Sequence, residues 1–209
     1  DLLFARASNL VSGLGREALQ LQAKIFEQLV LGQLHETIGP VDQEDPVDHY
    51  IQVLRDKTGS LIALAAQLGA MLSGADSSFQ KPLEEFGQSI GVAFQLIDDI
   101  IDIESTKSQS GKVSGTDLLA GVPTLPVLLL AKHDDTESVK LLADITSGLD
   151  AASLPEVLER LRAHPVMEES KLETRRWAEA AIAAIAPLPK GKVRTALEAF
   201  ALAVVERKG

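Results

Sequence analysis

The 209-residue chain contains no cysteine, so it can form neither a disulfide bond nor a thiolate metal site. It is also poor in positive charge, because 20 Lys and Arg residues stand against 30 Asp and Glu residues and give a net charge of −10. Nucleic acids and anionic membrane surfaces attract basic proteins, so this balance argues against both as partners. An anionic substrate would need a local group of Lys and Arg side chains or a bound metal cation.

The sequence also lacks long hydrophobic runs, strand patterns and repeats. No apolar run approaches the roughly 20 residues that a membrane helix needs, and no basic-then-apolar leader opens the chain, which together predict a cytoplasmic location. Alternating β-branched segments are nearly absent, and no repeat of solenoid length occurs. Hydrophobic residues still make up 45% of the chain, which is ordinary for a globular protein and argues against disorder.

Hydrophobic residues recur with the period of an α-helix along most of the chain. We therefore predict a single all-α domain over residues 1–209, with about nine helices. The segment from Lys81 to Ile103 is apolar nearly all round from Ile90 onward, so we expect it at the centre of a bundle. The polar, glycine-containing stretch from Ser105 to Gly115 predicts a mobile loop. The expected helices cover residues 2–11, 18–36, 49–72, 81–103, 123–131, 136–146, 154–163, 166–185 and 190–207.

Three carboxylates interrupt the apolar helix expected at the centre. Asp98 and Asp102 are four residues apart and share one helix face, whereas Asp99 lies about 100° around the helix. Like charges at this spacing repel each other, and burial increases the cost. Mg²⁺ would remove this repulsion, since it prefers oxygen ligands. Protonation would also remove it, and a solvated stripe of carboxylates is a further alternative, although the surrounding Leu and Ile residues leave little polar surface for water.

The carboxylates stand in the segment F-Q-L-I-D-D-I-I-D at residues 94–102, which resembles the second aspartate-rich motif of the trans-isoprenyl (polyprenyl) diphosphate synthases. Further segments resemble other motifs of that family in the same order. They are D-L-L-F-A-R-A at residues 1–7, K-T at 57–58, G-K-V-S-G-T-D-L at 111–118 and G-V-P-T-L-P at 121–126. The similarity runs along the whole chain and is specific as an ordered set.

This resemblance implies an isoprenoid-synthase-type helical bundle around a central cavity, here lacking its amino-terminal helices. It implies a Mg²⁺-dependent prenyltransferase that condenses isopentenyl diphosphate with an allylic diphosphate to make a polyprenyl diphosphate. The allylic diphosphate ionises, the isopentenyl double bond attacks the resulting carbocation, and a proton is lost. By the same resemblance we expect a homodimer without a transmembrane segment, and the resemblance allows a peripheral membrane contact for product release.

The resemblance also assigns the catalytic roles. Asp98, Asp99 and Asp102 would hold Mg²⁺, with Asp98 as the principal ligand. Lys57 and Lys112 would contact the allylic diphosphate as point charges and act with Asp98 in catalysis. Taken without the resemblance, either lysine could equally be a solvated surface charge.

Three more residues would contact substrate. Thr58 would help to position the diphosphate, Gln95 would polarise the site, and Phe94 would lie near the isopentenyl group. Gly59, which follows Thr58, could permit a break in its helix.

Some features leave alternatives open. Gln33 and Glu36 resemble a polar pair that lines the family's reaction cavity, but they could equally face solvent. Val122 stands where many family members have Lys, so one cationic contact to the diphosphate is missing. Arg207 would either add positive charge to the isopentenyl site or only cap the last helix.

The family's first aspartate-rich motif would lie before Asp1, which is not a Met. We therefore expect the chain to be the carboxyl-terminal part of a larger prenyl synthase domain that is inactive alone. The alternative is a catalytically silent subunit that binds prenyl substrates or regulates an active synthase. A class I terpene cyclase would share the all-α scaffold, but the K-T and G-x-D-L motifs argue against it. The sequence indicates neither product length nor the allylic primer.

Overall fold

The structure, a computed structural model, describes residues 2–105 and 114–207. Every regular element in these two stretches is a helix, which confirms the predicted all-α class. The elements are α1 (Leu2–Ser12), α2 (Arg16–Ile38), α3 (Pro46–Leu54), the π-helix η1 (Arg55–Gly59), α4 (Ser60–Ser73), the 3-10 helix η2 (Ser77–Phe79), α5 (Gln80–Glu104), α7 (Thr116–Leu119), α8 (Leu125–Leu130), α9 (Thr136–Thr146), α10 (Leu154–Ala163), α11 (Val166–Ala184) and α12 (Lys192–Val205).

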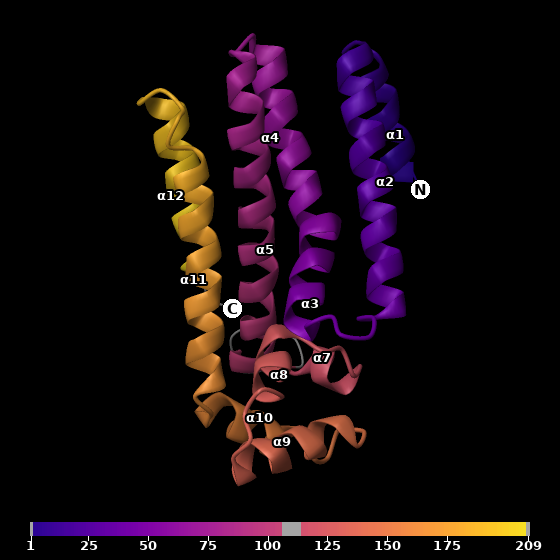
Figure 1. Ribbon diagram of the computed structural model, residues 1–209, viewed down its shortest axis with the longest axis vertical. Coiled ribbons are helices and arrows are strands. Elements are labelled where there is room, and N and C mark those ends of the chain that lie inside the picture. Colours follow the sequence, from indigo (N-terminus) through magenta and orange to yellow (C-terminus); the bar gives the residue numbers. More distant parts are fainter. Residues whose placement is uncertain (1, 106–113, 208–209) are drawn as a thin grey trace.

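The long helices stand side by side, and the short helices α7 to α10 lie together at one end of them (Figure 1). The elements α3, η1 and α4 follow one another without a gap and form one continuous rod, residues 46–73, beside α5. The rod and α5 run in opposite directions, because only η2 and a short turn connect them. The carboxyl end of α5, with its aspartates, therefore lies beside α3 and next to the short helices.

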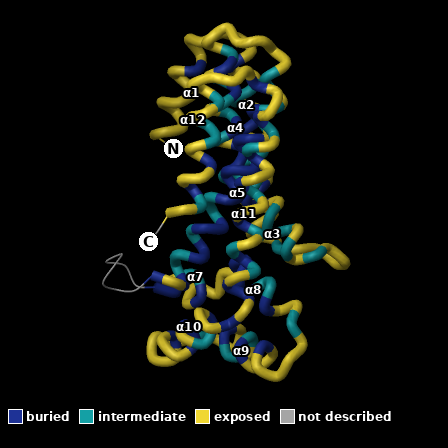
Figure 2. Tube along the Cα trace, turned by 90° about the vertical axis from the view of Figure 1, so that its left-hand side faces the viewer, coloured by how far each residue is buried: buried dark blue, intermediate teal, exposed yellow. Residues whose placement is uncertain are grey.

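Helix α5 is the central element, as predicted. It packs against α4 on one side and α11 on the other, and it is the most continuously buried helix of the trace (Figure 2). Phe86 and Ile100 are each 1% exposed and Ile90 is fully buried. Burying one such side chain contributes about 1.5–3 kcal/mol, so this helix supplies a large share of the hydrophobic stabilisation.

The backbones of α5 and the rod touch where glycines face each other. A Cβ atom on Gly91 would lie 2.4 Å from the Cα of Gly59, and a Cβ atom on Gly87 would lie 2.3 Å from the Cα of Ala63. No side chain fits between the two elements at these points. Lys57 lies two residues before Gly59 on the rod. The contact therefore fixes the position of Lys57 relative to the length of α5.

The rod differs from the helix expected over residues 49–72 at its start and in its middle. It begins at Pro46, because the Asp45 side chain accepts hydrogen bonds from the backbone N–H groups of Val47 at 2.8 Å and Asp48 at 3.3 Å. Such a cap followed by proline is a strong helix start. The helix does not break at Gly59. One π-helical turn, Arg55–Gly59, instead continues the rod through this residue, and such turns are often found at functional sites.

Part of the expected mobile loop is anchored. Residues 106–113 lie outside the described residues, but Gly115 follows them with a φ of +76° and donates its N–H to the backbone oxygen of Asp102 at 2.9 Å. The short helix α7 then begins at Thr116, where no helix was expected. Its first N–H groups bind the side chain of Asp102, so its cap comes from 14 residues upstream and not from a neighbouring residue.

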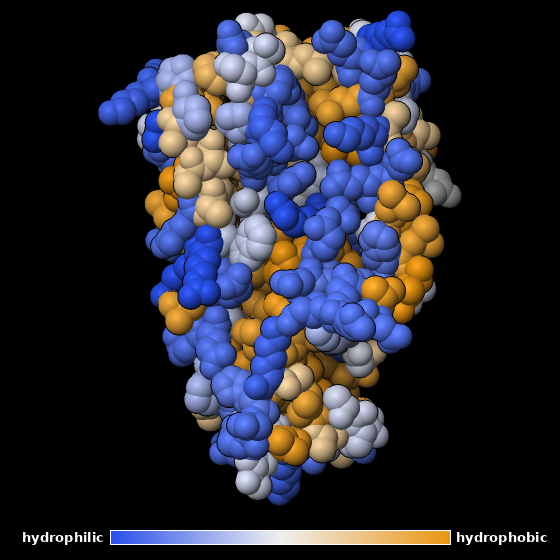
Figure 3. Space-filling model, viewed as in Figure 1, coloured by the Kyte–Doolittle hydropathy of each residue, from blue (hydrophilic) through white to orange (hydrophobic). Residues whose placement is uncertain are grey.

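Apolar side chains remain on the surface of α1 and α2. Figure 3 shows hydrophobic residues along the side of the molecule that these helices occupy. The most exposed of them are Leu2, Leu3, Leu10, Leu34 and Ile38. Within the described part of the chain, no helix combines the length and the apolar character that crossing a membrane requires.

We expect Gly91→Ala to lower the thermal unfolding midpoint, because the new methyl group would have to push the backbone of Gly59 away. Overpacking of this kind costs about 1–3 kcal/mol. Gly69→Ala is the matched control, since a Cβ on this α4 residue meets nothing within 4 Å and alanine favours a helix by up to about 1 kcal/mol. Circular dichroism melts measure both variants. Equal midpoints for the two would contradict the close contact.

Candidate active site

The aspartates of α5 are divided between two environments. Asp99 is only 6% exposed, whereas the side chain of Asp98 is 36% exposed and Asp102 is partly exposed. Each of the three has its own polar partners. Among the described residues, no three acidic or histidine side chains lie close enough together to hold one metal ion. The structure thus does not gather the three predicted Mg²⁺ ligands into one cluster.

Asp98 is paired with the end of the chain. Its Oδ1 lies 2.7 Å from Nη2 of Arg207, and the Arg207 guanidinium carbon lies 4.8 Å from the centre of the Phe94 ring. Phe94 and Asp98 are one helical turn apart on the same face of α5. Of the two interpretations of Arg207, the contacts favour a charge placed at the aspartate-rich helix over a cap on α12.

Asp102 holds the start of α7. Its Oδ1 accepts hydrogen bonds from the hydroxyl of Thr116 at 3.0 Å and from the backbone N–H of Thr116 at 3.3 Å. Its Oδ2 accepts the backbone N–H of Asp117 at 3.2 Å. Unpaired N–H groups at a helix start attract a carboxylate, so Asp102 fastens this segment to α5.

Asp99 is buried against α3 and α8. The hydroxyl of Tyr50 donates a hydrogen bond to its Oδ2, and the backbone N–H of Leu125 lies 3.5 Å from the same oxygen. Burial raises the pKa of Asp99 to about 7, while these two hydrogen bonds act in the opposite direction. Burial and the nearby Asp99 also raise the pKa of Tyr50, so its hydroxyl stays a donor. The sequence analysis missed Tyr50, although it is the chain's single tyrosine.

Lys57 projects from the π-helical turn toward α2. Its Nζ lies 2.5 Å from Oε2 of Glu36, and the Gln33 side-chain amide donates to the same oxygen at 2.8 Å. Gln33 and Glu36 are thus both exposed, as one of the two alternatives had it, and Glu36 also pairs with Lys57. The preceding residue, Asp56, also contacts α2: it is 7% exposed and accepts hydrogen bonds from Gln28 of α2 and from Gln52.

The structure places several predicted site residues on adjacent elements. The rod contacts α5 at two points, where Gly59 meets Gly91 and where Tyr50 meets Asp99. Lys57 and Thr58 lie on the rod between these two points. Thr58, Phe94 and Gln95 are each partly buried. Lys112 lies outside the described residues, so its predicted contact with the diphosphate stays a prediction. Val122 is exposed and follows α7, where its N–H donates to the backbone oxygen of Asp117.

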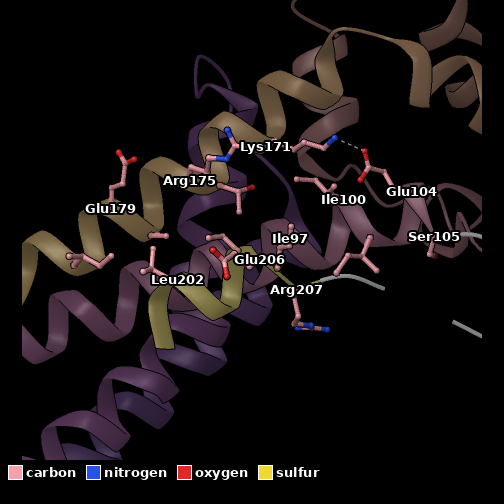
Figure 4. Close-up of a pocket in the computed structure, with 15 residues that line it drawn as sticks. Ile97, Ile100, Glu104, Ser105, Lys171, Arg175, Glu179, Leu202, Glu206 and Arg207 are labelled. Atoms are coloured by element: carbon pink, nitrogen blue, oxygen red, sulfur yellow. Dashed lines mark ion pairs between the residues drawn. The ribbon is translucent and has the colours of Figure 1, made fainter. Parts of the chain in front are cut away.

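A large cavity whose place and lining the sequence did not predict opens along the carboxyl end of α5. It has a volume of about 970 Å³ and lies between α5, α11 and the end of α12 (Figure 4). Ile97 and Leu202 contribute to its apolar wall, and Nζ of Lys171 lies 2.8 Å from Oε1 of Glu104 at its rim. Arg207 borders this cavity but points away from Lys171. Its walls come from three helices far apart in the sequence, so no local pattern indicated it.

The family model described as polyprenyl synthetase matches residues 1–161 of the chain. The chain belongs to the polyprenyl synthetase family. The chain is 41% identical over 210 residues to the nonaprenyl diphosphate synthase of Mycobacterium tuberculosis, with 100% of this chain and 63% of that protein covered. It is 32% identical over 192 residues to the heptaprenyl diphosphate synthase component 2 of Bacillus subtilis, with 92% of this chain and 55% of that protein covered.

A solved structure agrees with this assignment to the polyprenyl synthetases. The crystal structure of geranylgeranyl pyrophosphate synthase from Corynebacterium glutamicum, complexed with calcium and isoprenyl diphosphate, matches with a TM-score of 0.88 at 40% identity. The match covers 100% of this chain and 65% of that one. The likeness confirms the predicted isoprenoid-synthase-type bundle. The chain spans less than two thirds of the length of these three relatives.

We expect the Arg207→Gln variant of this chain to bind Mn²⁺, a paramagnetic substitute for Mg²⁺, more tightly than the wild type does. The variant frees the Asp98 carboxylate from its ion pair. Exposed ion pairs are worth about 0.2–1 kcal/mol, which corresponds to a gain of at most about fivefold in affinity. Electron paramagnetic resonance of free Mn²⁺ measures the binding.

Arg176→Gln serves as the control for the change in charge, because Arg176 forms an exposed pair with Glu173 on α11 at 3.2 Å. Its Mn²⁺ affinity should stay that of the wild type. Weaker binding in Arg207→Gln than in Arg176→Gln would show that Arg207 does not compete with the cation.

Proposed function

We propose that this chain contributes to the active site of a Mg²⁺-dependent polyprenyl diphosphate synthase, which joins isopentenyl diphosphate to an allylic diphosphate. The observation that supports the proposal is the backbone contact of Gly59 with Gly91, which packs the rod that carries Lys57 against the helix α5 that carries Asp98, in a member of the polyprenyl synthetase family. A cation and a carboxylate on adjacent helices suit a diphosphate with its metal. We propose that residues 1–209 act as one domain in this role.

Asp98 and Asp102 fit a hard divalent cation. Both are carboxylates on one helix face, both are partly exposed, and oxygen ligands are what Mg²⁺ prefers. The relative from Corynebacterium glutamicum was crystallised with calcium, another hard divalent cation, and with isoprenyl diphosphate. When bound, Mg²⁺ would supply positive charge to the diphosphate as it leaves the allylic carbon.

The side chains around the aspartates would orient the substrates. Lys57 would exchange its pair with Glu36 for an oxygen of the allylic diphosphate, and Thr58 beside it would help to hold that group. Gln95 would polarise the site, while Phe94 and Arg207 would lie near the isopentenyl diphosphate. Lys112 would add a second cation to the allylic diphosphate. These charges matter most as the leaving group develops its negative charge.

A silent or regulatory subunit is the second candidate. The name of the Bacillus subtilis relative, component 2 of a heptaprenyl diphosphate synthase, describes a protein with more than one component. The separate partners of the three aspartates also favour a site that is incomplete in this chain alone.

Apolar residues exposed on α1 and α2 would suit association with another subunit, and a homodimer is the form we propose. A cytoplasmic location stays a prediction.

The test measures incorporation of radiolabelled isopentenyl diphosphate into polyprenyl products by the complete reading frame that contains these residues. We expect Asp98→Asn to lower kcat by at least about 100-fold, because charge stabilisation at the leaving group is lost. Lys57→Met should act in the same direction. The controls are Asp144→Asn and Lys132→Met, which break exposed pairs with Arg160 and Asp45.

Wild-type turnover in Asp98→Asn would contradict the proposed role of this carboxylate. If the wild type makes no product alone but changes the output of an active synthase, the second candidate is correct.

A further inference from the structure

We propose that Asp99, the middle carboxylate of the aspartate-rich segment, is a positioning residue and not a ligand of the divalent cation. Its contacts with Tyr50 and Leu125, here called the Asp99 junction, hold α5 in register with the rod and with the start of α8. The inference rests on the proposed function, because it divides the carboxylates of that site between two roles.

The geometry of the helix separates Asp99 from its neighbours. Side chains four residues apart share a face, so Asp98 and Asp102 point to one side of α5. Asp99 is rotated by about 100° from Asp98 and enters the interior. The exposures agree with this division, since Asp99 is 6% exposed and the side chain of Asp98 is 36% exposed. A single cation could reach all three only if the end of α5 unwound.

The Asp99 carboxylate already has donors suited to its burial. A hydroxyl and a backbone N–H both point at Oδ2, and neither donor comes from α5 itself. A buried carboxylate that lost them would pay the desolvation cost of an unpaired polar group. A cation at Oδ2 would have to displace Tyr50, whose hydroxyl would then lose its acceptor, and the burial of the whole residue restricts access to Oδ1.

The Asp99 junction joins the three segments that carry the candidate site. Tyr50 lies on the rod seven residues before Lys57. Leu125 begins α8 and belongs to the segment at residues 121–126 that resembles a family motif. Asp99 itself adjoins Asp98. The Asp99 carboxylate thus fixes the positions of Lys57, Asp98 and that segment relative to one another. Together with the contact between Gly59 and Gly91, it holds the rod against α5 on both sides of Lys57.

The experiment compares Asp99→Asn, Tyr50→Phe, the double variant and Asp98→Asn in the 209-residue chain. Three quantities are measured on each: the thermal unfolding midpoint, the affinity for Mn²⁺ alone, and the affinity for inorganic diphosphate with Mn²⁺ present. The binding measurements are made well below the unfolding midpoint, so that only folded protein contributes. Tyr50→Phe is the conservative variant, because it removes one hydroxyl and no charge.

We expect Asp99→Asn and Tyr50→Phe to lower the midpoint, and the double variant to lower it by less than the sum, because the first weakens and the second removes the same hydrogen bond. Mn²⁺ affinity should stay near that of the wild type in both, whereas Asp98→Asn should lose more than about tenfold. Diphosphate affinity should fall severalfold in both junction variants, since it needs Lys57 and Asp98 in register. A role in stability alone would lower the midpoint without changing this affinity.

Two results would overturn the inference. One is a loss of Mn²⁺ affinity in Asp99→Asn as large as in Asp98→Asn while Tyr50→Phe binds normally, which would make Asp99 a ligand. The other is an additive effect of the two substitutions on the midpoint, which would show that Asp99 and Tyr50 do not act together. A wild-type chain that binds neither Mn²⁺ nor diphosphate would instead count against the proposed function. The midpoints of the four proteins would then still decide whether the Asp99 junction exists.

Discussion

The direct backbone contact between α5 and the rod is the constraint on which the rest of the site depends. Gly91 meets Gly59 and Gly87 meets Ala63, so no flexible side chain separates the two elements. A shift of α5 by one residue would bring the side chain of Ile90 or Val92 to a place where only a hydrogen atom fits. Because interiors pack as densely as organic crystals, such a contact permits a single register. Lys57 is held beside α5 by backbone geometry, before any charge acts on it.

Electrostatics then distinguish the three aspartates of a strongly acidic chain. Asp99 is satisfied by donors from α3 and α8, and Asp102 by donors that begin a helix. Asp98 is satisfied by Arg207, a long and exposed side chain at the end of the chain. Exposed ion pairs contribute little free energy, so the partner of Asp98 is the easiest to replace. The weak partner of Asp98 gives a physical reason why Asp98, rather than Asp99 or Asp102, would be the principal ligand of the cation. The resemblance alone gives no such reason.

The periodic features were predictable from the sequence and the irregular ones were not. The helices at residues 136–146 and 154–163 have the bounds expected from their apolar pattern, and the central position of α5 follows from its apolar circumference. The π-helical turn at Arg55–Gly59 could not be foreseen, because its residues suit an α-helix equally well and the close packing of Gly59 occurs only in the folded chain. The same holds for α7, whose cap is a carboxylate 14 residues away.

The aspartate-rich segment shows why residues that look alike in a sequence motif can have different roles in the folded site. Letters at positions 98, 99 and 102 look equivalent in a linear pattern, and metal binding is the chemistry that adjacent acids suggest. The helix period assigns them to different faces before any tertiary contact forms. An i, i+4 pair can share one ligand, whereas the residue beside it must find partners elsewhere in the fold. Where those partners are a half-buried tyrosine and a backbone amide, as at Asp99, one short segment would meet two physical requirements: charge for the proposed cation on one face and attachment to the next helices on the other.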